Sequence, residues 1–181
     1  MLPFSPANFF LVHFLISCRV KLTDLEVMKV LGVGAFGRVR LVKLRHPVDG
    51  IKDDGYFAMK CISKQLLTEN GLMSHILNEK TIMAGLEHPF INRFYCDMDD
   101  DKYLYFLLEA LTGGELCKRL REEKKFSESW GKFYSASVLF AFCHMHARKI
   151  AYRDLKPENL VMDSTGYVKV VDFGLAKVSV I

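Results

Sequence analysis

The segment YRDLKPEN at residues 152–159 concentrates charged and amide side chains within one short stretch. Asp154 can accept a proton, Lys156 can face a developing negative charge, and Asn159 offers an amide oxygen. A second carboxylate, Asp172 of the tripeptide DFG, follows thirteen residues after Asn159. A base, a cation and oxygen ligands for Mg²⁺ are the groups that phosphoryl transfer requires. The segment is therefore a candidate site for that chemistry.

A second candidate is a pair of opposite charges placed in apolar surroundings. Lys60 lies near the end of the strand-like run YFAMKCI at residues 56–62. Glu79 lies on an apolar stripe of helical spacing, between Ile76 and Met83. An inward lysine is costly without a counter-ion, so the two charges are expected to pair. The alternative is a solvent-facing lysine and an incidental glutamate.

The run GVGAFGRV at residues 32–39 is a glycine-rich turn of the form GxGxxGxV. Taken alone the motif is weak evidence of function, because a similar glycine pattern begins dinucleotide-binding units. Asp53 even lies about twenty residues downstream, where such a unit has an acid that binds the ribose. That fold needs a helix after the last glycine, whereas residues 39–42 alternate as a strand. A hairpin that lays backbone N–H groups over phosphates fits better. An ordinary turn and an NAD-binding oxidoreductase remain alternatives.

The composition describes a globular chain, since 50% of its 181 residues are hydrophobic and 25% are charged. The net charge of +4 is spread without a long basic block, which argues against nucleic-acid binding. Five cysteines without CxxC spacing predict neither a zinc site nor a disulfide framework and favour a cytoplasmic location. The apolar run at residues 7–18 is too short to cross a membrane. It is expected to pack on the domain or not to belong to the mature protein, and a membrane-surface anchor is the less favoured alternative.

Hydrophobic periodicity predicts the elements that position these residues. A strand, the glycine-rich turn and a second strand form a hairpin from Leu25, and a third strand carries Lys60. Two further strands flank residues 97–102, and a helix carries Glu79. A short helix near residues 116–120 precedes a long one at about residues 127–148. The long helix is apolar on almost every side, so it is expected to be buried centrally.

These motifs resemble the protein kinase family. The runs GGEL, YRDLKPENL and GYVKVVDFGLAK are most similar to the cyclic-nucleotide-regulated (AGC) group of Ser/Thr kinases, especially the cyclic-GMP-dependent type. The resemblance implies an α+β two-lobe fold, with a five-stranded antiparallel sheet plus a helix in the N-lobe and an incomplete helical C-lobe. The expected domains are an apolar segment of uncertain status at 1–19, the N-lobe and hinge at 20–111, and a partial C-lobe at 112–181.

The resemblance also implies the cofactors ATP and Mg²⁺ and a role for each motif residue. Asp154 is the expected catalytic base, Lys156 steadies the transferred phosphoryl group, and Lys60 contacts the ATP phosphates while pairing with Glu79. Asn159 and Asp172 are the expected metal ligands. The expected ATP-binding residues are Leu31, Gly32, Gly34, Gly37, Val39, Ala58, Lys60, Leu108, Glu109, Leu111 and Val161.

Two further sites follow from the resemblance. Glu115 and Glu158 are expected to face basic residues of a protein substrate near its target Ser or Thr, since carboxylates pair strongly with arginine. His75, Arg153 and Lys177 match positions that grip a phosphorylated threonine of the activation loop. The alternative for this trio is three unrelated surface residues.

In the resembled family an activation loop and further helices follow the DFG segment. The partial C-lobe is therefore expected to leave the long helix without its cover, and the isolated chain is expected to be inactive. The alternative function is a non-catalytic fragment that binds nucleotide or a partner. The expected partners are a protein substrate and a regulatory domain or subunit outside this chain.

Overall fold

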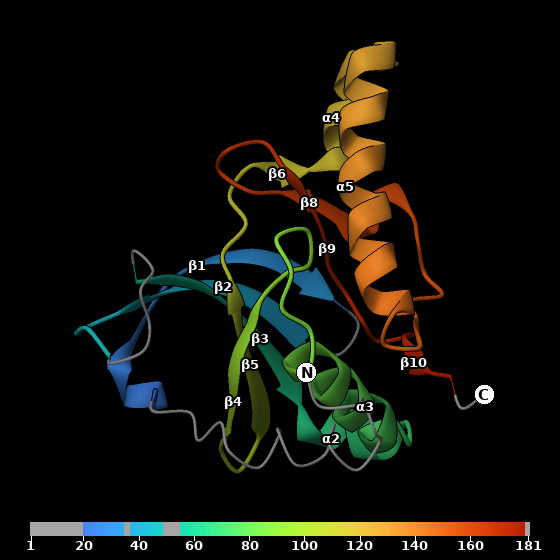
Figure 1. The fold of residues 1–181 in the computed structure, drawn as a ribbon. Helices are drawn as coiled ribbons and strands as arrows, with labels where there is room; N and C mark the ends of the chain where they lie inside the picture. The colour runs from blue at the N-terminus through green and yellow to red at the C-terminus, as the bar shows by residue number, and fades with distance from the viewer. Residues whose placement is uncertain (1–19, 35–36, 49–54, 180–181) are drawn as a thin grey trace. The chain divides into compact units, whose positions relative to one another are not determined.

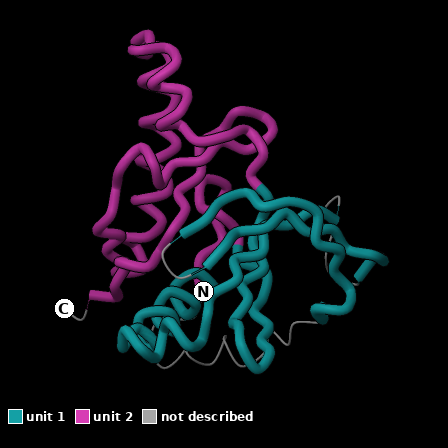
Figure 2. The backbone as a smooth tube through the Cα atoms, turned by 180° about the vertical axis from the view of Figure 1, so that it is seen from behind, with its two compact units in different colours: residues 1–84, 94–110 teal, residues 85–93, 111–181 magenta. Residues whose placement is uncertain are grey.

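The computed structural model describes residues 20–34, 37–48 and 55–179, so the segment 1–19 lies outside the described residues. The chain divides into two compact units (Figure 2). Unit 1 consists of residues 1–84 and 94–110, and unit 2 consists of residues 85–93 and 111–181. Residues 85–93 were expected in the N-lobe. They join unit 2 because Asn92 N donates to Val170 O at 3.0 Å and Val170 N donates to Phe90 O at 2.9 Å.

Unit 1 is built on a five-stranded sheet in the order β1-β2-β3-β5-β4, with every neighbouring pair antiparallel (Figure 1). The predicted five-stranded antiparallel sheet is confirmed. The short helix α2 was not predicted, and it begins where Ser63 accepts a hydrogen bond from Leu66 N. The elements are η1 (Leu22–Asp24), β1 (Leu25–Gly34), β2 (Gly37–Leu44), β3 (Tyr56–Ser63), α2 (Lys64–Glu69), α3 (Met73–Ala84), β4 (Phe94–Asp99) and β5 (Tyr103–Glu109).

The glycine-rich sequence joins two strands of one hairpin, as predicted. Gly34 at the end of β1 pairs with Gly37 at the start of β2, and β2 continues as a strand to Leu44. Gly37 is required there, because a Cβ atom would overlap the carbonyl oxygen of Cys61 on β3. A strand after the last glycine removes the dinucleotide-binding alternative, whose fold needs a helix at that point.

The two faces of this sheet carry different side chains, because successive residues of a strand point to opposite faces. Lys60 on β3 pairs with Val39 of β2 and Phe106 of β5, and this row shares a face with Glu79 of α3. The neighbouring rows point the other way. That second face holds a hydrophobic cluster formed by Val20, Leu25, Val42, Phe57, Met59, Cys61, Cys96 and Leu107.

Unit 2 combines two helices with short strands. Strands β6, β8 and β9 form a three-stranded sheet in the order β6-β8-β9, and β7 pairs with β10. The loop that carries Asp154 runs from β7 to η2. The elements are β6 (Gly114–Glu115), α4 (Leu116–Glu123), α5 (Glu128–His146), β7 (Ile150–Ala151), η2 (Pro157–Asn159), β8 (Leu160–Met162), β9 (Val168–Val170) and β10 (Lys177–Val178).

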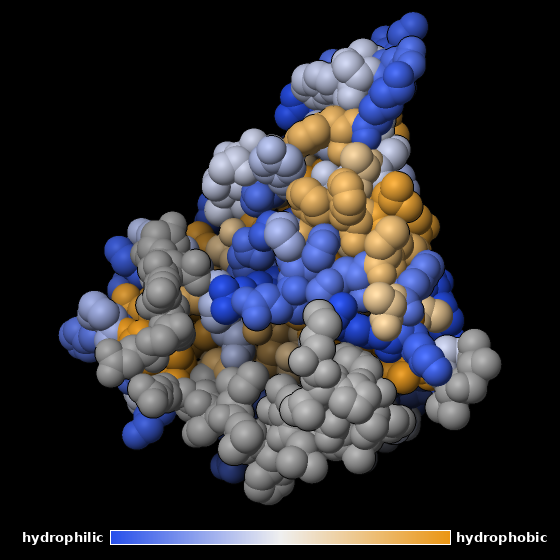
Figure 3. Space-filling model, viewed as in Figure 1, coloured by the Kyte–Doolittle hydropathy of each residue, from blue (hydrophilic) through white to orange (hydrophobic). Residues whose placement is uncertain are grey.

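Helix α5 begins at a serine cap, where Ser127 Oγ accepts a hydrogen bond from Trp130 N at 3.3 Å. The expectation that this helix is buried on all sides is wrong in this unit. Only one face is buried, against β7 and β9, and it is formed by Tyr134, Ser137, Ala141 and Met145. Other positions of this helix leave large apolar side chains partly exposed, namely Trp130, Phe133, Leu139 and Phe140, and Figure 3 shows apolar surface over α5. Leu139, which is 62% exposed, is the most exposed of them.

Across residues 20–34, 37–48 and 55–179, no helix combines the length and apolar character that crossing a membrane requires. Cys61, Cys117 and Cys143 are free thiols, whereas Cys96 is disulfide-bonded. The cysteine pattern therefore did not predict the state of Cys96.

Candidate functional site

Unit 1 carries one group of candidate residues, in which Lys60 and Glu79 form the expected ion pair. Lys60 Nζ lies 2.6 Å from Glu79 Oε1. The Glu79 side chain is only 3% exposed and that of Lys60 is 27% exposed. Glu79 points inward because it shares the buried face of α3 with Ile76 and Met83. The pair fixes the lysine head group beside the sheet.

A second ion pair holds α3 against the sheet. Lys80 Nζ lies 2.7 Å from Asp97 Oδ2 on β4, and both side chains are partly buried. Sequence reasoning missed this pair, because neither residue belongs to a motif. Its position next to Glu79 on α3 means that two successive residues of the helix are tied to different strands.

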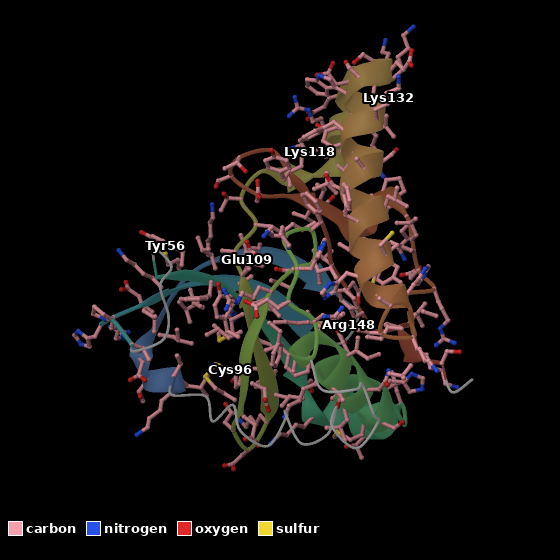
Figure 4. The ribbon with its side chains drawn as sticks, viewed as in Figure 1. Tyr56, Cys96, Glu109, Lys118, Lys132 and Arg148 are labelled. Carbon is pink, nitrogen blue, oxygen red and sulfur yellow. The ribbon has the colours of Figure 1, made fainter. Side chains whose placement is uncertain are left out.

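The residues expected around ATP in unit 1 gather along one face of the sheet. In the strand register Val39 pairs with Lys60, and Ala58 pairs with Leu108. Because residues two apart share a face, all four lie on the face of Lys60. Ala58 and Leu108 are buried, and Glu109 ends β5 (Figure 4). Leu31, Gly32, Gly34 and Gly37 lie in the β1–β2 hairpin, whereas Leu111 and Val161 belong to unit 2.

Unit 2 carries a second group of candidate residues in the loop between β7 and η2. Lys156 Nζ lies 2.8 Å from Asp154 Oδ2. Asn159 Nδ2 donates to the same Oδ2 at 2.8 Å and to the backbone oxygen of Asp154 at 3.0 Å. Asn159 is buried and η2 begins with Pro157, so the amide that orients Asp154 is held firmly. The structure therefore brings Asp154, Lys156 and Asn159 together, as the sequence predicted.

Charge around Asp154 keeps its carboxylate ionised. The hydrogen bond from Lys156 is the largest cause that lowers the pKa of Asp154; burial opposes it, and the bond from Asn159 adds a smaller lowering effect. The same contact raises the pKa of Lys156, with the nearby carboxylates of Asp172 and Glu158 contributing. Both side chains thus carry full charge at neutral pH, and Asp154 is available as a hydrogen-bond acceptor.

The backbone is strained at two positions beside these groups. Arg153 has a φ angle of 68° and Asp172 has one of 57°, a left-handed conformation that non-glycine residues rarely adopt. Such conformations persist only where the surroundings hold them, and they gather at functional sites. No sequence pattern predicted them, because neither residue is glycine.

Tyr152 and Arg153 tie the catalytic loop to the DFG segment. The buried Tyr152 donates its hydroxyl to Val171 O at 2.6 Å, and its ring lies 5.4 Å from that of Phe173. Arg153 Nε donates to Leu175 O at 2.7 Å. These bonds fix the backbone on both sides of Asp172, at Val171 and at Leu175, which explains how its unusual φ angle is maintained. The sequence pointed to both residues without predicting these bonds.

The oxygen atoms left free by these contacts suit Mg²⁺. Asn159 commits its Nδ2 to Asp154, which leaves Oδ1 to bind a cation. Asp172 Oδ1 accepts a weak bond from Gly174 N at 3.3 Å, and its other carboxylate oxygen has no hydrogen bond to another described residue. Hard oxygen donors of this kind are the ligands that Mg²⁺ prefers.

The remaining predicted residues are placed less completely. Glu115 on β6 and Glu158 on η2 are both exposed, and these two elements are in contact. Lys177 on β10 pairs with Ala151 on β7, and Ala151 is two residues before Arg153. His75 lies on α3 of unit 1, so the grouping of His75, Arg153 and Lys177 stays a prediction.

Comparison with known proteins identifies the family. Residues 25–180 match the protein kinase domain, so this chain belongs to the protein kinase family. Over 158 residues it is 49% identical to cGMP-dependent protein kinase, isozyme 1, of Drosophila melanogaster, covering 87% of this chain and 20% of that protein.

Two further relatives agree with this match. Human cGMP-dependent protein kinase 2 is 47% identical over 154 residues, which are 85% of this chain and 19% of that protein. The cAMP-dependent protein kinase catalytic subunit of Dictyostelium discoideum is 39% identical over 175 residues, which are 97% of this chain and 26% of that protein. The chain thus spans about a fifth to a quarter of the length of these relatives.

Proposed function

We propose that this chain is part of an ATP-dependent protein serine/threonine kinase that transfers the γ-phosphate of ATP to a protein hydroxyl. The observation that carries the proposal is the geometry of Asp154, whose carboxylate is held by Lys156 and Asn159 within 2.8 Å. Family membership and the names of the relatives support the same reaction.

In the proposed reaction the substrate hydroxyl attacks the γ-phosphorus, its proton passes to Asp154, and the bond from that phosphorus to the β-phosphate oxygen breaks. Asp154 orients the hydroxyl through its carboxylate. Lys156 faces the transferring phosphoryl group and offsets its charge. Lys60, held by Glu79, binds the phosphates of ATP. Mg²⁺ bound through Asn159 and Asp172 supplies charge neutralisation for the phosphates.

The proposed protein substrate carries Arg or Lys near its Ser or Thr. Glu115 and Glu158 are exposed carboxylates on contacting elements of unit 2, and they suit guanidinium groups, which bind carboxylates in a bidentate manner. A substrate with acidic residues in the same places would meet repulsion. A peptide library that revealed a preference for acidic or proline-directed sites would contradict this part of the proposal.

Regulation is proposed to come from a domain or subunit other than the matched kinase domain. Two of the relatives are named for dependence on cGMP and one for dependence on cAMP, and the match covers at most about a quarter of their length. A cytoplasmic location belongs to the same proposal.

The central experiment measures Mg-ATP binding and phosphate transfer to a basic peptide with the same preparation. We expect Asp154→Ala to lower the rate of transfer by about 10²- to 10⁴-fold, the range that positioned acid–base groups contribute. ATP affinity is expected to stay within about twofold, because Asp154 acts on the hydroxyl. Asp101→Ala, which removes an exposed acid of unit 1, is the matched control. Measurable phosphate transfer that Asp154→Ala left equally fast would contradict the proposal.

A second function is favoured by the exposed apolar face of α5, where Leu139 is 62% and Phe140 57% exposed. A unit with this much apolar surface in water is less firmly packed, and small errors in position reduce catalysis steeply. The chain would then bind nucleotide or a partner without transferring phosphate. Saturable Mg-ATP binding that Lys60→Met abolishes, with no phosphate transfer, would support this function over the first.

A further inference from the structure

Unit 1 contains a cavity on the sheet face that points away from Lys60. The cavity has a volume of about 450 Å³, within the range of small-molecule sites. Its lining comes from η1 and from strands β1, β2, β3 and β5, and consists of Leu22, Leu25, Val27, Arg38, Arg40, Met59, Cys61, Tyr103 and Tyr105. Every lining residue belongs to one unit, so the cavity does not depend on unit 2.

The strand register explains why these residues meet. Arg38 pairs with Cys61, which pairs in turn with Tyr105, so the three form one row across β2, β3 and β5. Arg40 pairs with Met59 in the next row on the same face. Directly opposed residues lie about 4.5–5.5 Å apart at Cβ. Each arginine therefore lies beside a buried residue of the cavity floor, Arg38 beside Cys61 and Arg40 beside Met59.

The floor of the cavity carries no negative charge. Met59 and Leu25 are buried hydrophobic residues, and burial is the largest effect that raises the pKa of the Cys61 thiol, which keeps it neutral. Asp100, whose charge acts on the Cys61 thiol, already accepts hydrogen bonds from the Tyr105 hydroxyl at 2.8 Å and from Tyr103 N at 2.7 Å. Asp100 is not part of the lining.

The two arginines have no ionic or hydrogen-bond partner among the described residues. Within residues 20–34, 37–48 and 55–179, neither guanidinium takes part in an ion pair or a hydrogen bond. The Arg40 side chain is half-buried, whereas that of Arg38 is exposed. An arginine fork prefers carboxylate or phosphate oxygens. An apolar cavity floor beside two guanidinium groups that have no partner among the described residues therefore complements a molecule with an anionic head group and an apolar body.

We propose that this cavity, formed by Arg38, Arg40 and the apolar floor of Met59, Leu25 and Cys61, is a binding site for a small amphipathic carboxylate of the fatty-acid type. The head group lies against the two guanidinium groups and the acyl chain covers the floor. The site lies on the face opposite Lys60 and does not depend on the proposed phosphate transfer.

The test uses the 181-residue chain with ¹³C-methyl-labelled methionine and octanoate as the probe. We expect a saturable shift of the Met59 methyl resonance, with no shift of Met162 in unit 2. Octanol and octylamine, which keep the apolar body but lack the anion, are expected to bind at least about tenfold more weakly. Inorganic phosphate, which lacks the apolar body, is expected to bind more weakly as well.

Three variants locate the site. Arg38→Ala and Arg40→Ala are each expected to weaken octanoate binding about tenfold, whereas Arg45→Ala, which removes an exposed charge outside the lining, leaves it unchanged. Val27→Trp fills the cavity from its exposed rim while keeping both arginines, and it is expected to abolish binding. The proposal is overturned if octanol binds as tightly as octanoate, if Val27→Trp still binds, or if the arginine variants bind as well as Arg45→Ala.

Discussion

Lys60 Nζ and Glu79 Oε1 lie 2.6 Å apart, and the carboxylate is almost completely buried between α3 and the sheet of unit 1. The buried carboxylate lacks water to replace a lost partner. The pair is therefore expected to matter more for stability than the surface ion pairs of the same unit.

Removal of the Lys60 charge tests this relationship. We expect Lys60→Met to lower the free energy of unfolding of the chain by about 3–5 kcal/mol, because it strands the Glu79 carboxylate. The change should be measured by urea denaturation. Lys64→Met, which removes a partner of the more exposed Asp99 at 2.7 Å, is the matched control and should cost about 0–1 kcal/mol.

A double variant separates the stranded charge from lost packing. Lys60→Met combined with Glu79→Leu removes both charges, so it should be less destabilised than Lys60→Met alone. If the single and double variants were equally destabilised, the cost would come from packing and the proposed electrostatic cause would be wrong.

The electrostatic arrangement around Asp154 gives a second prediction. The hydrogen bond from Lys156 is the largest cause that lowers the pKa of Asp154, and the bond from Asn159 is a smaller one. Lys156→Met is therefore expected to raise the pKa of Asp154 toward the ordinary aspartate value, and by more than Asn159→Ala does. Carboxyl ¹³C NMR across an acid titration measures both shifts.

Asp163 serves as the internal reference for this titration. Its pKa is lowered by hydrogen bonds from Thr165 and Tyr167 against burial, so none of its contacts changes in either variant. A pKa of Asp154 that stayed unchanged in Lys156→Met would show that the 2.8 Å contact does not persist in solution.

A prediction for pH dependence comes from two histidines of unit 2. The rings of His88 and His144 lie 4.7 Å apart, and Arg148, two residues after the end of α5, contacts His144 Nδ1 at 3.1 Å. Burial is the largest cause that lowers the pKa of each histidine, followed by the charge of Arg148. His144 Nε2 is buried without a hydrogen-bond partner among the described residues.

The sign follows from proton binding. Each histidine has a lower pKa in the folded chain than the value of 6.5 expected when unfolded, so the unfolded state binds more protons between the two values. The stability that the neutral rings contribute is complete above about pH 6.5 and is lost as the pH falls toward the folded values. We expect urea midpoints, read from the fluorescence of the single Trp130, to fall between about pH 7.5 and pH 5.5.

A pair of variants assigns this effect to the buried ring. His144→Gln should reduce the loss of stability on acidification, because it removes one of the titrating groups. His146→Gln, which changes an exposed histidine of the same helix, should leave the loss as it is. Equal pH profiles for the two variants would contradict the assignment.

The sequence predicted the parts of the fold that depend on local patterns. The glycine-rich hairpin and the sheet followed from alternating apolar residues. The Lys60–Glu79 pair was predictable because each charge stood among apolar neighbours of regular spacing. The cluster at Asp154 was found through residues close together in the sequence.

Features that depend on tertiary contacts could not be read from such patterns. Residues 85–93 join unit 2 through backbone bonds to Val170, which no side-chain pattern marks. The left-handed backbone at Arg153 and Asp172 is imposed by the bonds of Tyr152 and Arg153 to the DFG segment. The cavity beside Arg38 and Arg40 depends on the register of three strands, which hydrophobic alternation alone does not fix.

The exposed face of α5 gives the last prediction. Trp130, Phe133, Leu139 and Phe140 leave apolar surface in water, and each large apolar side chain gains about 1.5–3 kcal/mol when fully buried. Without another partner, the 181-residue chain is therefore expected to associate with further copies of itself through this face. Sedimentation velocity over a series of concentrations should detect the association. Leu139→Lys places a charge at the most exposed of these positions and is expected to weaken the association at least about tenfold. Leu77→Lys, at a position that is 51% exposed on α3 of unit 1, should have no such effect. A chain that stayed monomeric at all concentrations, or that responded equally to the two substitutions, would show that the α5 face does not drive association.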